Sequence, residues 1–229
     1  MKYIGIIAAL NEEIEAIKEL MNDISESEIY ELKFIKGKIN KKDVVLVKCG
    51  VGKVNAARTT QILIDNFEID YIINVGTAGG INEEIEIGDL VVAQKLVQHD
   101  FDITAAGHEK GYITDIGKYF YSDKMLIEKT KTIIEKINEN FNAFIGTIAT
   151  GDIFVQDIEV KDRIKKEFNA DCVEMEGAAI AQVCSLNNIS FIVIRAISDK
   201  PNGKNTIDFE TYLKMACERY AKFIDFFIN

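Results

Sequence analysis

Residues 71–80 read YIINVGTAGG, an apolar run that leads directly into a glycine-rich segment. Tyr71–Val75 is predicted to be a short buried strand, because a brief apolar run that ends in turn-forming residues is typical of a strand inside a sheet. Gly76–Gly80 is predicted to be a turn, in which glycine lets the backbone approach a polar ligand closely. By itself a glycine-rich turn is a weak functional signal, since most such turns are only structural.

The same alternation of buried strands and helices extends outward from this stretch. Further strands are predicted at Tyr3–Ala9, Leu90–Val97, Phe144–Thr150 and Phe191–Ile197, with a meander over residues 28–48 that turns at Asn40, Lys41 and Lys42. Helices are predicted after an N-cap at Asn11 and at Val54–Phe67, Ser122–Asn138, Asp157–Phe168, Met175–Leu186 and about Asp208–Phe227. This order predicts an α/β fold in which helices flank a central mixed β-sheet. No linker interrupts it, so residues 1–229 are expected to form a single domain.

The composition is that of a globular chain with an acidic surface. Of its 229 residues 48% are hydrophobic, and 27 Lys and Arg against 37 Asp and Glu give a net charge of −10. This apolar content excludes intrinsic disorder. The negative charge argues against nucleic acid as a partner, because phosphate contacts need clustered Lys and Arg. No stretch approaches the ~20 apolar residues of a membrane span, so a membrane is not expected as a partner.

Cysteines and histidines indicate a reducing compartment and chemistry without a metal. The four cysteines have no Cys-x-x-Cys spacing and lie in apolar or helical runs, where cysteine usually acts as a small hydrophobic residue. A cytoplasmic location is therefore expected. Two histidines are too few for a multi-histidine site, and no organic cofactor motif is present, so neither a metal nor a cofactor is expected. Chemistry is expected to depend on carboxylates.

Polar clusters follow several of the predicted strands. They are Asn11–Glu13, Gly76–Gly80, Gly151–Phe154 and Ser198–Asp199. Each has a structural explanation when taken alone, because acidic residues suit a helix N-terminus and Asp199 can cap a turn. Open α/β sheets, however, bind ligands at the carboxyl ends of their strands. Together the clusters predict a carboxylate-lined cleft, and cleavage of a glycosidic bond uses two such groups, an acid for the leaving group and a base for water.

The segment Gly50-Val51-Gly52-Lys53 looks like a phosphate-binding loop only at first sight. A P-loop needs glycine at position 47 and Ser or Thr after the lysine, and Val47 and Val54 stand there. We interpret the segment as a tight turn that enters a helix.

Seven ordered motifs cover the chain from Met1 to the C-terminal helix. They are IGIIAALNEEIEAI near the start, CGVGKVNAA at 49–57, INVGTAGG at 73–80, HDFDITAAGH at 99–108, TGDIFV at 150–155, VEMEGAAIA at 173–181 and VIRAISD at 193–199. In this order they resemble the 5′-methylthioadenosine/S-adenosylhomocysteine nucleosidases, within the purine nucleoside phosphorylase superfamily. The resemblance implies hydrolysis of the N-glycosidic bond of these two nucleosides, which releases adenine and the 5′-thio-substituted ribose.

The resemblance also implies catalytic roles for two carboxylates. Glu13 matches the family's base, which activates the attacking water. Asp199 matches the acid that protonates the purine at N7, with the help of Ser198. A free aspartic acid has a pKa of ~3.9, so Asp199 can carry this proton only if its pKa is raised or a neighbour holds the proton in place.

The other matched positions are expected to bind the substrate or support the catalytic groups. Glu176 matches the carboxylate that binds the ribose hydroxyls, and Met175 packs on the sugar. Phe154 stacks on adenine and the main chain of Val155 binds it, while Thr77 and Gly79 lie beside sugar and base. The apolar lining around the 5′-thio group is matched by Leu10, Val51, Ile103 and Phe209. The residues that hold the water and its base in place are matched by Glu174 and Arg195.

Water is the expected nucleophile rather than phosphate. By resemblance, phosphorylases hold phosphate with one arginine early in the chain and one just before the central glycines. Position 74 is asparagine here, and the first forty residues contain no arginine. A phosphate-dependent purine nucleoside phosphorylase remains an alternative, as does a catalytically silent adenine-nucleoside-binding protein. The presence of both Glu13 and Asp199 argues against the silent protein.

Family members are usually dimers, so a homodimer is expected in which the partner chain completes the 5′ pocket near the glycine-dotted loop Ile103–Gly117. The family often has aromatic residues at 106–108, where this chain has Ala106 and His108. This smaller, more polar lining leaves open the ranking of methylthioadenosine, S-adenosylhomocysteine and related 6-amino nucleosides.

Overall fold

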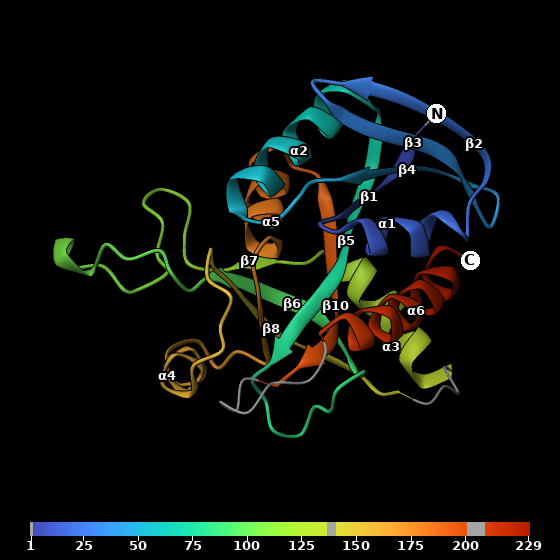
Figure 1. Ribbon diagram of the computed structural model, residues 1–229. Coiled ribbons are helices and arrows are strands. Elements are labelled where there is room, and N and C mark those ends of the chain that lie inside the picture. Colours follow the sequence, from blue (N-terminus) through green and yellow to red (C-terminus); the bar gives the residue numbers. More distant parts are fainter. Residues whose placement is uncertain (1, 137–140, 201–208) are drawn as a thin grey trace.

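The computed structural model describes residues 2–136, 141–200 and 209–229 (Figure 1). Its elements are, in chain order, β1 (Tyr3–Ala8), α1 (Asn11–Lys18), β2 (Asn22–Ile29), β3 (Leu32–Ile39), β4 (Lys42–Lys48), α2 (Lys53–Asn66), β5 (Ile69–Gly80), β6 (Leu90–Gln98), the short 3-10 helix η1 (Thr104–Ala106), β7 (Phe120–Tyr121), α3 (Lys124–Lys136), β8 (Ala143–Thr150), α4 (Ile158–Phe168), β9 (Cys172–Glu174), α5 (Gly177–Leu186), β10 (Ser190–Asp199) and α6 (Phe209–Ile228). The α/β prediction is confirmed. The predicted helix ends at Asn138 and Asp208 lie outside the described residues.

The first half of the sheet is an open, mixed layer. β1 runs parallel to both β4 and β5, and β4, β3 and β2 follow as an antiparallel meander. The predicted turn between β3 and β4 is present, with Asn40 and Lys41 at positive φ, a conformation that asparagine adopts more readily than most residues. The meander starts at Asn22, earlier than predicted, because the edge strand β2 is almost entirely exposed and so has no hydrophobic pattern to reveal it.

The second half of the sheet closes into a ring. β5 pairs with β10, β10 with β6, β6 with β8, β8 with β9, and β9 again with β5. The expectation of an open sheet with one common ligand-binding edge was therefore wrong for this half. β1, β5 and β10 run parallel to one another, whereas β8 and β9 run opposite to β5. Ring closure, rather than a shared edge, brings the polar segments that follow β8 and β9 close to the polar residues at the C-terminal ends of β1, β5 and β10.

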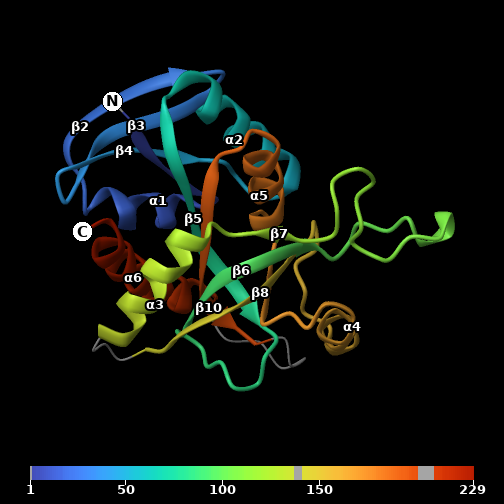
Figure 2. The same ribbon diagram turned by 180° about the vertical axis from the view of Figure 1, so that it is seen from behind.

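Helices cover both faces of the sheet (Figures 1 and 2). Alternate strand residues point to opposite faces, so Ile6 and Ile73 pack toward α1, α3 and α6, whereas Ile7 and Ile72 pack toward α2 and α5. Because both faces are covered, the central strands are apolar throughout, as their sequences predicted. Each fully buried aliphatic side chain contributes roughly 1.5–3 kcal/mol to folding. In the described parts of the chain no helix is long and apolar enough to span a membrane.

Gly76–Gly80 is the C-terminal end of strand β5 rather than the predicted turn. Thr77 pairs with Ala196 of β10, and Gly79 pairs with Val173 of β9. Gly80 allows close packing, since a Cβ there would lie only 3.1 Å from Cγ2 of Ile197. β9 was not predicted at all, because three residues are too short to show a periodic pattern.

Candidate active site

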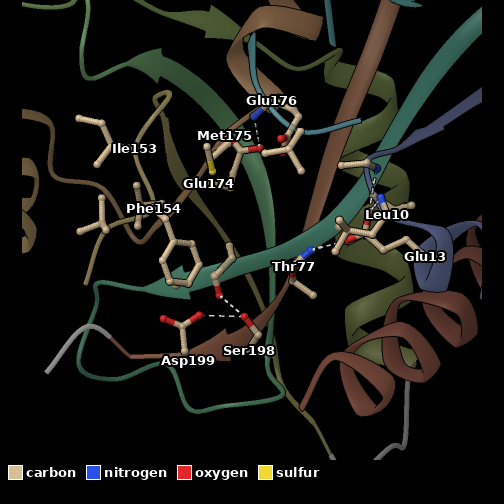
Figure 3. A pocket seen from close by; sticks show the side chains of 18 residues that line it. Leu10, Glu13, Thr77, Ile153, Phe154, Glu174, Met175, Glu176, Ser198 and Asp199 are labelled. Atoms are coloured by element: carbon tan, nitrogen blue, oxygen red, sulfur yellow. Dashed lines mark hydrogen bonds between the residues drawn. The ribbon is translucent and has the colours of Figure 1, made fainter. Parts of the chain in front are cut away.

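A cavity of about 250 Å³ lies where the ends of β1, β5, β9 and β10 meet the segment after β8 (Figure 3). Twelve of the predicted site residues line it: Leu10, Glu13, Val51, Thr77, Gly79, Phe154, Val155, Glu174, Met175, Glu176, Ser198 and Asp199. These residues come from six separate stretches of the chain. The fold therefore gathers most of the predicted site into one place.

Glu13 is fixed at one end of the cavity by three backbone donors. It lies in the first turn of α1 and is only 1% exposed. Its Oε2 accepts the N–H groups of Ala9 and Leu10 at 2.9 and 3.0 Å, and its Oε1 accepts that of Thr77 at 3.2 Å. Burial raises the pKa of this carboxyl, and the backbone donors together with Arg195 offset only part of the increase. A base with a raised pKa accepts a proton more readily at neutral pH.

The predicted N-cap at Asn11 was wrong. Leu10 occupies the N-cap position, and its backbone N–H is satisfied by Glu13. The side chain of Asn11 instead accepts a hydrogen bond from Lys48 at 2.8 Å. The carboxylate expected to act as a base thus also closes the start of its own helix, which restricts its orientation.

Behind the cavity, Arg195 and Glu174 form a buried ion pair. Arg195 is 1% exposed and does not line the cavity; its Nε and Nη2 both contact Oε2 of Glu174, and Nη2 also donates to Oδ1 of Asn74 at 2.6 Å. Glu174 further accepts the Thr150 hydroxyl and the N–H of Gly177. Charge-assisted bonds of this kind hold both groups rigidly.

Glu176 lies on the wall of the cavity just before α5. It is 7% exposed, and its Oε1 accepts the N–H of Gly52 at 2.8 Å. Burial and, next, the charge of Glu174 raise the pKa of Glu176 to about 7. The helix that follows starts with small buried residues and packs against α2, which explains the enclosure of this carboxyl. The predicted helix start at Met175 was too early, because Glu174 still belongs to β9.

Asp199 and Ser198 end β10 at the opposite end of the cavity from Glu13 (Figure 3). The Ser198 hydroxyl lies 2.9 Å from Oδ1 of Asp199 and donates to it. Burial raises the pKa of Asp199, and the Ser198 hydrogen bond offsets part of that increase. The side chain therefore holds a proton more readily than a free aspartic acid, as a general acid requires.

The segment after β8 forms the wall beside Asp199. Phe154 is 56% exposed and its ring stands between Met175 and Asp199, whereas Val155 is buried at 5% exposure (Figure 3). Ile153, which the sequence analysis missed, lines the same wall. The other lining residues that were not predicted contribute backbone or small apolar surface and carry no chemical signal in the sequence: Ala9, Val75, Gly76, Ala78 and Val173.

Of the predicted lining residues, Ile103 does not lie in the cavity wall. Ile103 is absent because its loop, residues 103–117, projects away from the body of the molecule (Figures 1 and 2). Phe209 begins α6, but its side chain lies outside the described part of the chain. Both remain predictions.

Comparisons with known proteins agree with this site. The sequence profile of the phosphorylase superfamily matches residues 3–229. A 5′-methylthioadenosine/S-adenosylhomocysteine nucleosidase of Staphylococcus haemolyticus is 41% identical over 227 residues, which cover 99% of each chain. The crystal structure of the Neisseria meningitidis nucleosidase of that name, in complex with methylthio-immucillin-A, is 35% identical and superposes with a TM-score of 0.94 over 100% of this chain and 99% of that one.

A second kind of hydrolase shares the fold. The futalosine hydrolase of Helicobacter pylori is 32% identical, and its structure superposes with a TM-score of 0.93 over 99% of this chain and 97% of that one. The superfamily profile matches almost the whole chain, and the nucleosidase relative is similar along 99% of its length. The chain thus belongs to the 5′-methylthioadenosine/S-adenosylhomocysteine nucleosidase family of the phosphorylase superfamily.

Proposed function

We propose that this chain hydrolyses the N-glycosidic bond of 5′-methylthioadenosine and S-adenosylhomocysteine, releasing adenine and the 5′-thio-substituted ribose. The observation that carries the proposal is the placement of Glu13 and Asp199 at opposite ends of one cavity, each with a raised pKa. Hydrolysis of this bond needs a general acid on the side of the leaving adenine and a general base on the side of the attacking water. The names of the full-length relatives support the same substrates.

Asp199 is proposed to act as the general acid. Adenine leaves poorly until its N7 carries a proton, and Asp199 stands beside Phe154, the residue proposed to stack on adenine (Figure 3). Proton donation lets the bond to the anomeric carbon break early, which leaves an oxocarbenium-like sugar. General acid catalysis of this kind contributes typically ~10²–10⁴-fold.

The carboxylates around the sugar are proposed to stabilise its positive charge. Glu176, expected to bind the ribose hydroxyls, and Glu13 line the same cavity, and both are almost inaccessible to bulk water. Electrostatic interactions are stronger in such a site than in water. Glu13 then takes a proton from the attacking water, while Arg195 and Glu174 hold the surrounding groups in place.

Water is proposed as the nucleophile because the described lining of the cavity offers no cation for a phosphate. None of the described residues that line it is an arginine or a lysine. Arg195 lies behind the wall, where Glu174 and Asn74 already accept its hydrogen bonds. A phosphate dianion would also be repelled by Glu13 and Glu176.

Residues 1–229 are proposed to act as one domain within a homodimer. Val51, Ile153 and Phe154 line the cavity and are between 45% and 56% exposed, and several exposed apolar side chains at one site are typical of an interface. A partner chain that covers these side chains is proposed to bring its own Ile103 loop to the 5′ end of the pocket. The four cysteines are all free and buried, which suits the proposed cytoplasmic location.

Futalosine is a second candidate substrate, favoured by the likeness to the futalosine hydrolase. It should be offered to the enzyme beside methylthioadenosine and S-adenosylhomocysteine at equal concentration. The ratio of kcat/KM values ranks the three nucleosides, and a value for futalosine above both others would replace the proposed substrates.

The decisive experiment measures adenine release from methylthioadenosine in phosphate-free buffer. The wild type should release adenine, and Glu13→Gln and Asp199→Asn should each lower kcat by ~10²–10⁴-fold. Glu12→Gln and Asp70→Asn change exposed carboxylates that do not line the cavity and should leave kcat unchanged. Release only after phosphate is added would show a phosphorylase. Saturable nucleoside binding without release would show a silent binding protein.

A further inference from the structure

Two sequence motifs have no role in the chemistry above, yet they meet beside the cavity. One is the glycine-lysine turn that ends at Lys53, and the other is the His99-Asp100 pair at the end of β6. The ammonium group of Lys53 lies 2.6 Å from Oδ1 of Asp100, and both side chains are 18% exposed. Lys53 also donates to Gln98 at 3.2 Å, and Gln98 donates to Gln182 of α5 at 2.7 Å. The lysine is therefore held in a largely enclosed network.

The same two residues hold the start of the segment 151–155. Oδ2 of Asp100 accepts the backbone N–H of Asp152 at 2.9 Å. In return, Oδ1 of Asp152 accepts the backbone N–H of Lys53 at 2.8 Å. Lys53, Asp100 and Asp152 thus form a closed set of contacts between three distant parts of the chain. Burial alone would raise the pKa of Asp100, but the hydrogen bonds from Lys53 and Asp152 outweigh it and hold the pKa below its usual value, so this carboxylate is ionised at neutral pH.

The glycine next to Lys53 connects this set of contacts to the sugar side of the cavity. The N–H of Gly52 donates to Oε1 of Glu176 at 2.8 Å. Gly52 has a φ of +98°, which only glycine adopts easily, and a Cβ there would lie 3.1 Å from Oδ1 of Asp152. Successive N–H groups of one turn therefore hold Glu176 and Asp152.

We propose that Lys53 and Asp100 are positioning residues, which fix the adenine-binding segment 151–155 relative to the sugar-binding carboxylate of Glu176. The proposal deepens the proposed function, on which it rests for the roles of Phe154, Val155 and Glu176. Asp152 stands two residues before Phe154, so a shift of its backbone moves the surface that adenine contacts. The pair acts through the protein and contacts no substrate itself.

Adenine binding tests the proposal separately from catalysis. Lys53→Met and Asp100→Ala should each weaken the binding of adenine, measured by titration calorimetry, by about tenfold. KM for methylthioadenosine should rise similarly while kcat changes by less than about threefold, because positioning of the base affects binding more than the chemical step. Lys53→Arg should restore near-normal affinity, because a guanidinium can also pair with Asp100. The double variant Lys53→Met/Asp100→Ala should bind no more weakly than either single variant, because the two residues form one unit.

The control is Lys33→Met, which breaks an exposed ion pair with Glu26 and should leave adenine binding unchanged. Adenine affinity within about twofold of the wild type in Lys53→Met and Asp100→Ala would overturn the proposal. Loss of a residue that positions the adenine-binding segment should change the affinity by more than twofold. If these variants do not fold, Asp152→Ala is the second test. It removes the acceptor of the Lys53 N–H from an exposed position and should weaken adenine binding to the same extent. Unchanged adenine affinity in Asp152→Ala would overturn the proposal as well.

A wild type that binds adenine but does not hydrolyse methylthioadenosine would contradict the proposed function only. In that case weaker adenine binding in the variants would still support the positioning role. A wild type that binds no adenine would overturn both.

Discussion

The hydroxyl of Ser198 lies 2.9 Å from Oδ1 of Asp199 and 3.4 Å from the carbonyl oxygen of Ala78. A serine hydroxyl has one proton to donate, so it can serve only one of these acceptors at a time. When Asp199 is ionised, donation from Ser198 stabilises the carboxylate. When Asp199 is protonated, its carboxyl O–H can donate a hydrogen bond to Oγ of Ser198, whose own hydroxyl then donates to the carbonyl oxygen of Ala78. Ser198 therefore opposes the effect of burial on the pKa of Asp199.

Ser198→Ala should move the alkaline limb of the pH profile to higher pH. The variant removes the hydrogen bond that lowers the pKa of Asp199, so burial raises that pKa further. The protonated acid then survives to higher pH, by about 1 pH unit for a lost bond of about 1.4 kcal/mol. The measurement is kcat/KM for methylthioadenosine between pH 5 and 10, which reports groups of the free enzyme. A limb that stays in place or moves to lower pH would contradict this role of Ser198.

Glu176→Gln should stabilise the fold at alkaline pH. The pKa of Glu176 rises from 4.5 to about 7 on folding, so the native state binds more protons than the unfolded state between these values. The wild type therefore loses stability as pH rises from 4.5 to about 7. The glutamine keeps an oxygen for the N–H of Gly52 but carries no charge.

Urea unfolding at pH 4 and pH 8 measures this effect. At about 1.4 kcal/mol per pKa unit, Glu176→Gln should exceed the wild type in unfolding free energy by up to about 3 kcal/mol at pH 8, and by little at pH 4. The exposed Glu12→Gln is the matched control. An equal effect of Glu176→Gln at both pH values would show that the charge of Glu176 is not the cause.

Gly76→Ala should lower activity without unfolding the protein. A Cβ at this position would lie 3.2 Å from Oε1 of Glu13 and 3.5 Å from the guanidinium of Arg195. The added methyl group would press on the carboxylate of the proposed base and move it from its position at the cavity. We expect kcat to fall by about 10²-fold, the size of effect that a misplacement of about 1 Å produces. Unchanged kcat together with an unchanged unfolding midpoint would show that the reaction does not depend on the exact position of the Glu13 carboxylate.

Asn74→Leu should destabilise the protein. Asn74 is 1% exposed, accepts from Arg195 at 2.6 Å and donates to the carbonyl of Ile7 at 2.9 Å. Leucine has a similar volume but leaves a buried guanidinium N–H without its acceptor, which costs about 1.5–3 kcal/mol for a charged donor. Urea unfolding at pH 7 measures the loss. Asn22→Leu on the exposed edge strand β2 is the matched control, and a loss no larger than that of the control would show that Asn74 does not hold Arg195.

Local patterns were sufficient to predict most elements, whereas most of the cavity wall was predicted from the family motifs. The apolar runs of β1, β5, β8 and β10 stand out because both faces of their sheet are covered, and twelve matched motif positions line one cavity. The edge strand β2 and the short β9 were missed because neither carries a hydrophobic period. Gly76–Gly80 was mistaken for a turn, because glycines that allow close packing inside a ring look the same in sequence as glycines that turn the chain.

The sequence by itself determined the alternation of strands and helices, the acidic surface and the family motifs, because these depend on residue type and spacing along the chain. Only the tertiary structure decided which strands close into a ring and which groups are enclosed. The contact of Glu13 with Thr77 joins residues 64 positions apart, and that of Gly52 with Glu176 joins residues 124 positions apart. The pKa of each carboxyl depends on its burial and on such distant neighbours, so the acid and the base acquire their properties only when the chain has folded.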